Sequence, residues 1–208
     1  MLVLPVVGML VLFGILVSRE SDEYLETNAV SQEVRLSLTV QNMIHELQRE
    51  RGLTAGLLGG DTRFRPDLVE QRRQTDDARA VLDSALAHTD VSARDTVRTA
   101  LGSLDNQDKV RATVDAGTAN QNATFDFYTA AVDALSVDLT TSDVGDLTLR
   151  EHLASLRTLG DAKEALARER GFLSAVFAAG RFTGDEYVRF AGIRAARLAA
   201  LEDRKSVV

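Results

Sequence analysis

One four-residue motif occurs twice in this 208-residue chain, and its charges are suited to holding a small ligand. Arg-Glu-Arg-Gly stands at Arg49–Gly52 and again at Arg168–Gly171, an offset of 119 residues. A guanidinium keeps its proton and presents a planar fork of N–H donors, which matches a planar oxyanion through paired hydrogen bonds. The repeated motif therefore indicates a site for a small anion, with internal ion pairs as the alternative.

The second arginine of each copy is predicted to lie on the apolar face of a helix. Arg51 follows Leu47 by four residues, and Arg170 follows Leu166 by the same step, which keeps each pair on one side of a helix. The first arginine of each copy points elsewhere and is predicted to be solvated. Because burial of an unpaired guanidinium is costly, an anionic group must meet both Arg51 and Arg170.

Two sources of that negative charge stay open. The duplicated helices can bring Arg51 and Arg170 to one pseudo-symmetric point, where a small diffusible anion binds. Lys163 lies one heptad before Arg170 and either adds charge to this point or extends its ammonium to solvent. Alternatively, a carboxylate of the chain itself pairs with each arginine, and the acidic candidates are Glu46, Glu50, Asp76, Glu164 and Glu169.

Other chemistry is poorly supplied. The chain has no Cys, and its three histidines are scattered at His45, His88 and His152, so we expect no metal site and no cofactor. We find no nucleophile–base pair and expect no catalytic residues in this fragment. The 24 Lys and Arg against 31 Asp and Glu give a net charge of −7, which argues against a nucleic-acid partner.

Helical spacing of apolar residues runs through most of the chain, and no strand-like alternation persists. The chain has only two prolines, which favours long uninterrupted helices. The fold class is therefore all-α, with long antiparallel helices in a four-helix-bundle arrangement. The predicted helices cover residues 30–58, 66–88, 93–115, 120–135 and 149–180, and a last one begins near residue 183.

The arginine motif belongs to a longer internal duplication. Each copy reaches a glycine, an Arg-Phe pair and a new helix, and these features favour duplication over coincidence. The apolar stripe of each copy is predicted to face the core. At the offset of 119 residues, Val40 corresponds to Leu159, Leu47 to Leu166, and Leu58 to Phe177.

The two ends of the chain differ from the rest. Residues 1–17 carry no charge and reach about 26 Å as a helix, so we interpret them as one transmembrane helix, with a cleaved signal peptide as the alternative. Residues 203–208 match the translation of a widely used sequencing adapter, and we expect them to be a sequence artefact. Residues 18–202 are then a helical domain truncated at its carboxyl end.

Four segments in order resemble one known family. They are Leu47–Ala55, Gln71–Asp76, Phe125–Thr129 and Arg168–Ala175. Together they look like the NIT domain, the nitrate- and nitrite-sensing module, over about residues 30–200. Members of that family are all-helical. They occur as extracytoplasmic sensors of histidine kinases and chemoreceptors, or as cytoplasmic regulators of RNA-binding antiterminators.

The resemblance implies a NIT-like sensor domain over residues 18–202, binding nitrate or nitrite. It implies Arg51 and Arg170 as the ligand-binding residues, with Arg49, Arg168, Thr54 and Ser174 as second choices. We expect the extracytoplasmic sensor region of a cell-membrane receptor, a homodimer in a two-component system, whose intact form is a sensor histidine kinase. Ligand binding would be transmitted by helix repacking. The alternative is a ligand-free structural or dimerisation bundle of a membrane protein with internally paired arginines.

Overall fold

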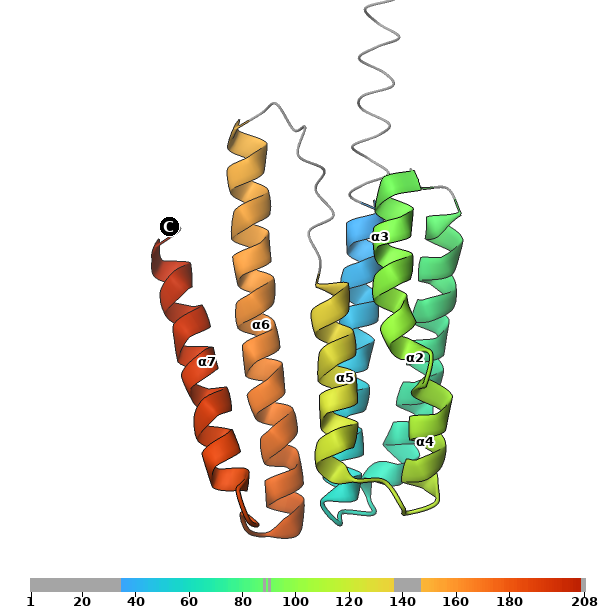
Figure 1. Cartoon of the computed structure of the whole chain (residues 1–208), viewed down its shortest axis with the longest axis vertical. Helices are drawn as coiled ribbons and strands as arrows, with labels where there is room; N and C mark the ends of the chain where they lie inside the picture. The colour runs from blue at the N-terminus through green and yellow to red at the C-terminus, as the bar shows by residue number, and fades with distance from the viewer. Residues whose placement is uncertain (1–34, 88, 90, 137–146, 207–208) are drawn as a thin grey trace, which may run out of the picture.

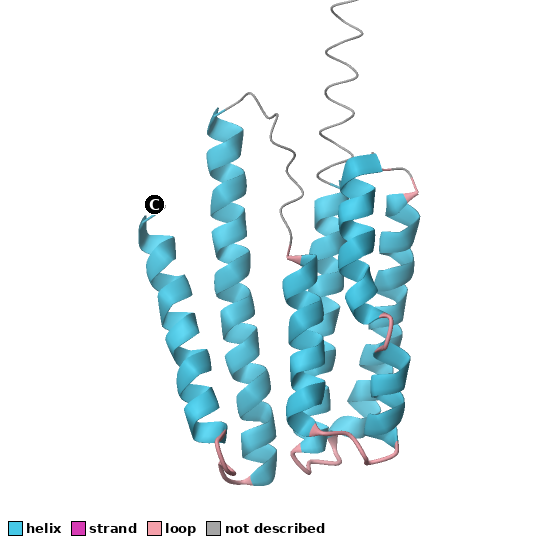
Figure 2. Cartoon of the chain, in the orientation of Figure 1, coloured by secondary structure: helices cyan, strands magenta, loops and turns pink. Residues whose placement is uncertain are grey.

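The computed structural model describes residues 35–87, 89, 91–136 and 147–206 (Figure 1). All regular structure in these residues is helical, and no strand occurs among them (Figure 2). The all-α prediction is therefore confirmed. A helix over residues 35–58 is followed by α2 (Phe64–Leu86), α3 (Val91–Leu101), the 3₁₀ turn η1 (Gly102–Leu104), α4 (Gln107–Asp115), α5 (Gln121–Leu135), α6 (Leu147–Ala179) and α7 (Glu186–Ser206).

Local sequence explains several helix ends. The Asn120 side chain accepts a hydrogen bond from the Ala123 backbone N–H at 2.9 Å and caps α5. Before α7, the Thr183 N–H donates to the Glu186 carboxylate at 2.6 Å, which is one of the two hydrogen bonds of a capping box. The α6 helix ends before Gly180, whose φ of 70° is a conformation that favours glycine.

One predicted helix is divided in the structure. Residues 93–115 were expected to form one helix, but α3 gives way to η1 at Gly102, and α4 begins only at Gln107. Glycine inside a helix costs about 1 kcal/mol relative to alanine, and a short 3₁₀ turn is a common way to interrupt a helix. The Asp105 N–H donates to the Gly102 carbonyl at 3.2 Å within this turn.

The largest hydrophobic core lies between the 35–58 helix, α2, α3 and α5, which stand side by side in Figure 1. Its side chains come from one face of each helix, as the spacing of apolar residues requires. Tyr128 of α5 is wholly buried in it. The buried members include Val40, Met43 and Leu47 of the 35–58 helix, Ala78, Leu82 and Leu86 of α2, Val97 and Leu101 of α3, and Val132 and Leu135 of α5.

The α6 helix packs closely against the 35–58 helix. Although α2 and α5 run in the opposite direction, the 35–58 helix and α6 run parallel to each other (Figure 1). They meet at the two glycines of the repeated motif: a Cβ added to Gly171 would lie 3.7 Å from the Gly52 Cα atom. Further along, a Cβ added to Gly59 would lie only 2.4 Å from the Ala175 carbonyl oxygen. Small residues therefore let the two backbones approach.

The apolar stripe of α6 is more exposed than the sequence predicts. Val40 and Leu47 of the first copy are 3% and 0% exposed, whereas their counterparts Leu159 and Leu166 are 50% and 45% exposed. Phe177 is likewise exposed. The α7 helix packs on a different side of α6, through a cluster that contains Phe172, Phe190 and Ile193. The stripe exists, but no described helix covers it, so the predicted burial of this face is wrong.

The transmembrane helix expected at residues 1–17 lies outside the described residues. Within the described part of the chain, no helix combines the length and apolar character that crossing a membrane requires.

Candidate anion-binding site

A pocket of about 370 Å³ opens between three helices that carry the sequence motifs. The 35–58 helix supplies one wall, α2 the second and α6 the third. Its lining residues are Gln48, Arg49, Gly52 and Leu53 from the 35–58 helix, Phe64, Asp67, Glu70, Gln71 and Gln74 from α2, and Ala167, Arg170, Gly171 and Ser174 from α6.

Two arginines, Arg49 and Arg170, are the cationic residues of this lining. The Arg49 side chain is 48% exposed, and its closest carboxylate is that of Glu46 at 4.0 Å. Arg170 is exposed, and no ion pair or hydrogen bond joins its guanidinium to another residue that the structure describes. Ser174, one helical turn beyond Arg170, brings a hydroxyl to the same pocket. The pocket therefore offers a guanidinium from each copy of the repeat and a hydroxyl from the second copy.

Arg51 lies elsewhere, in a buried ion pair. Its guanidinium donates to both Glu164 carboxylate oxygens, at 2.8 and 3.1 Å, and to the Thr129 hydroxyl at 3.0 Å. The same group lies over the Phe125 ring, 5.1 Å from its centroid. The predicted burial of Arg51 is confirmed, at 1% exposure. Its anionic partner is one of the carboxylates proposed as the alternative to a ligand.

The prediction that Arg170 is buried like Arg51 is wrong. Arg170 shares a helix face with Leu166, as its spacing requires, but that face of α6 is open among the described residues. The side chains of the first arginines are both partly exposed, Arg49 at 48% and Arg168 at 29%. The Arg168 guanidinium donates to Asp133 at 2.7 Å and to Glu164 at 3.3 Å.

The four arginines of the two motifs thus form two pairs, and each pair contains one arginine from each copy. Arg51 and Arg168 both donate to Glu164, which also accepts from Gln48 at 2.8 Å. Arg49 and Arg170 line the pocket. Of the two hydroxyl candidates, Ser174 lines the pocket, whereas Thr54 is buried and its hydroxyl has no hydrogen-bond partner among the described residues.

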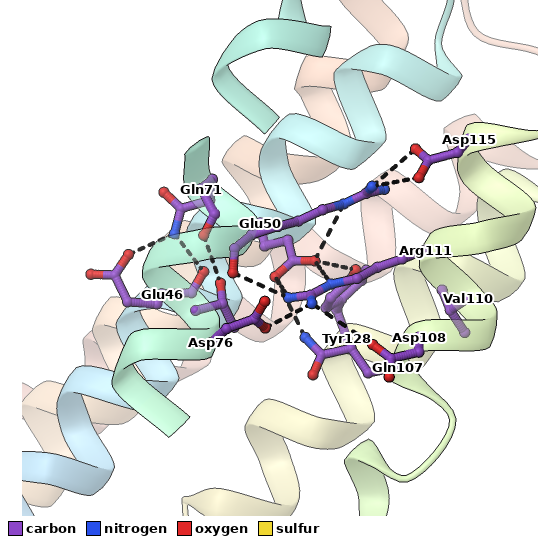
Figure 3. Close-up of polar contacts among 12 residues, drawn as sticks. Glu46, Glu50, Gln71, Asp76, Gln107, Asp108, Val110, Arg111, Asp115 and Tyr128 are labelled. Atoms are coloured by element: carbon purple, nitrogen blue, oxygen red, sulfur yellow. Dashed lines mark hydrogen bonds and ion pairs between the residues drawn. The ribbon is translucent and has the colours of Figure 1, made fainter. Parts of the chain in front are cut away.

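A second polar cluster lies beside the pocket, inside the helical core (Figure 3). Glu50 is wholly buried and accepts hydrogen bonds from Arg111 at 2.7 and 2.9 Å and from the Tyr128 hydroxyl at 2.8 Å. Arg111 also donates to Asp76 at 2.7 Å. The cluster joins the 35–58 helix to α2, α4 and α5. Glu50 bonds to residues of α4 and α5, whereas the adjacent Arg51 bonds to residues of α5 and α6.

Burial and charge shift the pKa values within this cluster. Burial and the negative charge of Glu50 raise the pKa of the Tyr128 hydroxyl well above its usual value. Burial lowers the pKa of Arg111, but hydrogen bonds and charge from Glu50 and Asp76 outweigh it and raise the pKa overall. Both groups therefore keep their protons firmly, which suits a structural role.

Sequence reasoning missed most of this second cluster. The sequence offers Glu50 as one of five possible partners for Arg51 or Arg170, whereas its partner is Arg111. No pattern distinguishes Arg111 from other helical arginines. Gln71 was noted only within a family motif. The structure places Gln71 in the pocket wall, where its amide donates to the Glu46 carboxylate at 2.6 Å. Its spacing from Leu68 and Ala78 places Gln71 on the apolar face of its helix, but no local pattern indicates its partner.

The pocket lining carries two cationic and two anionic side chains. Arg49 and Arg170 stand on the walls formed by the 35–58 helix and α6, whereas Asp67 and Glu70 stand on α2. Glu70 is engaged by Arg73 at 2.6 Å, which leaves less of its charge to oppose an anion. Among the described residues, no group of three or more His, Asp or Glu side chains could hold a metal ion.

Comparison with known proteins identifies the family of the chain. No curated protein sequence matches the chain. A solved structure, that of the NasR transcription antiterminator, superposes with a TM-score of 0.76 at 16% identity and shares the fold. That match covers 96% of this chain and 56% of the other, so this chain spans little more than half of that protein's length. The family model described as nitrate and nitrite sensing matches residues 42–207, and the chain therefore belongs to the NIT family.

Proposed function

We propose that this chain senses nitrate or nitrite, and that the anion binds in the pocket between Arg49 and Arg170. The observation that carries the proposal is the Arg170 guanidinium, which lines the pocket and has no carboxylate partner among the described residues. A planar oxyanion can accept paired hydrogen bonds from such a group. Arg49 on the facing helix and the Ser174 hydroxyl supply further donors.

Arg51 has a different role in this proposal from the one the sequence suggested. Its two Nη groups donate to Glu164 and Thr129, so it holds α6 and α5 to the 35–58 helix. Removal of Arg51 would disturb the pocket by loosening α6, not by removing a ligand contact. The ligand-binding residues that we propose are Arg49, Arg170 and Ser174. Arg168 is not among them, because its guanidinium donates to Glu164 and Asp133.

A signal can arise because the pocket spans helices that belong to two packed groups. Arg49 stands on a helix of the main core, whereas Arg170 stands on α6, which pairs with α7. An anion that binds both arginines would favour the helix arrangement in which the two are closest. The signal requires that the anion binds one arrangement more tightly than the other.

We further propose that the chain is the extracytoplasmic sensor region of a membrane receptor, a homodimer of the sensor histidine kinase type. The uncharged residues 1–17 support a membrane anchor. Membrane fractionation of cells that express the full chain tests the anchor, because deletion of residues 1–17 should release the protein. A protease added outside the inner membrane should cleave the helical domain only if it is extracytoplasmic.

The competing function is a ligand-free structural bundle in which both Arg51 and Arg170 are paired within the protein. The Arg51–Glu164 ion pair supports this alternative for Arg51. Calorimetric titration of the full chain with nitrate, nitrite and chloride separates the two. We expect saturable heat with nitrate or nitrite, lost in Arg170→Gln and weakened at least about tenfold in Arg49→Gln. Arg63→Gln removes an arginine that is 89% exposed and should leave binding unchanged. The absence of heat with every anion in the folded parent protein would support the structural bundle.

A further inference from the structure

The internal repeat predicts a partner for Arg170 by symmetry. The 35–58 helix and α6 run in the same direction (Figure 1). The equivalent glycines Gly52 and Gly171 lie against each other. Two parallel helices that meet at equivalent residues are related by an approximate twofold axis along their length. Each contact from the first helix to the second should then have a counterpart in the opposite direction.

The Arg51–Glu164 ion pair is one half of such a relationship. At the offset of 119 residues, Arg51 corresponds to Arg170, and Glu164 corresponds to residue 45. The counterpart of the ion pair would therefore join Arg170 to a carboxylate at position 45. The chain has His45 there instead. The repeat thus pairs one arginine with a carboxylate and leaves its equivalent without one.

The surroundings of His45 agree with this placement. His45 is half-buried, and both Arg170 and Lys163 of α6 are close enough to act on its charge. Arg49 and Glu46 act on it from its own helix. His45, Arg49 and Gly52 follow one another in steps of four and three residues, so His45 lies one helical turn from the pocket on the same side of the helix.

We propose that His45 keeps the anion site open and sets its charge. An imidazole in the position of the missing carboxylate does not neutralise Arg170, and its protonated form adds a positive charge beside Arg49 and Arg170. This proposal rests on the proposed function, because it concerns the affinity of the same pocket for nitrate or nitrite. It makes His45 a positioning residue, since it acts on the anion through the arginines and through its charge.

The expected pH dependence follows from the groups that face His45. Burial and the positive charges of Lys163, Arg49 and Arg170 lower its pKa below 6.5, while Glu46 opposes them. His45 is therefore mainly neutral at pH 7. A bound anion stabilises the imidazolium, so binding should be accompanied by proton uptake and should tighten as the pH falls toward the pKa of His45.

The test compares nitrate titrations of the full chain at about pH 5.5 and about pH 7.5. We expect the parent protein to bind several-fold more tightly at the lower pH, and His45→Gln to bind with little pH dependence. His45→Glu restores the carboxylate that the repeat predicts, and it should weaken nitrate binding by tenfold or more at both pH values. Ser37→Glu adds the same charge at an exposed position of the same helix and should bind like the parent protein.

The outcomes separate the two proposals. If the folded parent protein binds neither nitrate nor nitrite, the proposed function is wrong, and the role of His45 falls with it. If the parent protein binds and His45→Glu binds equally well, position 45 does not control the site. If His45→Gln keeps the full pH dependence, another group carries the proton. The His45→Gln profile decides the matter even where His45→Glu fails to fold.

Discussion

The Arg51 guanidinium and the Glu164 carboxylate face each other across the contact between the 35–58 helix and α6, joined by hydrogen bonds of 2.8 and 3.1 Å. Neither group has ready access to water, with side-chain exposures of 0% and 10%. Because both charges are largely desolvated, each depends on the other, and loss of one leaves a buried charge unpaired. This pair therefore fixes how α6 sits on the rest of the protein.

Replacement of Glu164 by Ala should destabilise the protein by about 3 kcal/mol, because it strands the buried Arg51 guanidinium. Urea unfolding followed by circular dichroism measures the change. Asp133→Ala removes a carboxylate that is 54% exposed and bonded to Arg168, and it should cost less than about 1 kcal/mol. Equal losses in the two variants would show that burial does not govern the Glu164 contact.

Removal of the Tyr128 hydroxyl should also weaken the fold. Tyr128→Phe deletes a buried donor to Glu50, and we expect a loss of about 1 kcal/mol in the free energy of unfolding. Glu50 keeps its two bonds from Arg111, which limits the loss. Tyr187→Phe is the matched control, since Tyr187 is 66% exposed. A stability change in the control as large as that of Tyr128→Phe would contradict the assignment.

Tyr128 also predicts a dependence of stability on alkaline pH. Its pKa is raised in the folded state, so the folded protein holds this proton more tightly than the unfolded chain does. The stabilisation is fully present below the unfolded pKa of about 10 and is lost as the pH rises above it. Unfolding measured at about pH 8 and about pH 10.5 should show a decline in the parent protein that is smaller in Tyr128→Phe. Parallel declines would exclude Tyr128 as the source.

Gly52 in the 35–58 helix and Gly59 just after it should respond in opposite directions to alanine. A Cβ at Gly59 would meet the Ala175 carbonyl oxygen at 2.4 Å and its Cα atom at 2.9 Å, so Gly59→Ala should lose about 2 kcal/mol by forcing two backbones apart. A Cβ at Gly52 meets nothing within 4 Å. Gly52→Ala should therefore gain up to about 1 kcal/mol from helix propensity. Thermal unfolding of both variants tests the difference.

Helix positions were largely predictable from the sequence, because local residues determine them. Gly180 and the Thr183–Glu186 pair marked the boundary between α6 and α7 correctly. The break at Gly102 was missed, since one glycine in a periodic segment is compatible with either a continuous or a divided helix.

The candidate site was less predictable, because it depends on which helix faces meet. The spacing showed that Arg51 and Arg170 each lie on an apolar stripe, but it could not show that only one stripe is covered. Glu164 was one of five candidate carboxylates, and the choice among them required the relative rotation of the 35–58 helix and α6. Gln71 and Arg111 reach their partners from distant parts of the chain, and no local pattern reports such contacts.

The contact between Gly52 and Gly171 divides α6 into two unequal arms. The helix spans 33 residues, and its crossing point at Gly171 lies 24 residues from Leu147 and 8 from Ala179. At 1.5 Å per residue, the long arm measures about 36 Å, so a tilt of about 5° at the crossing displaces its end by about 3 Å. The pocket lies at this crossing point, because Gly52 and Gly171 are among its lining residues. A sub-ångström adjustment around a small bound ion would therefore be magnified mechanically at the far end of the helix.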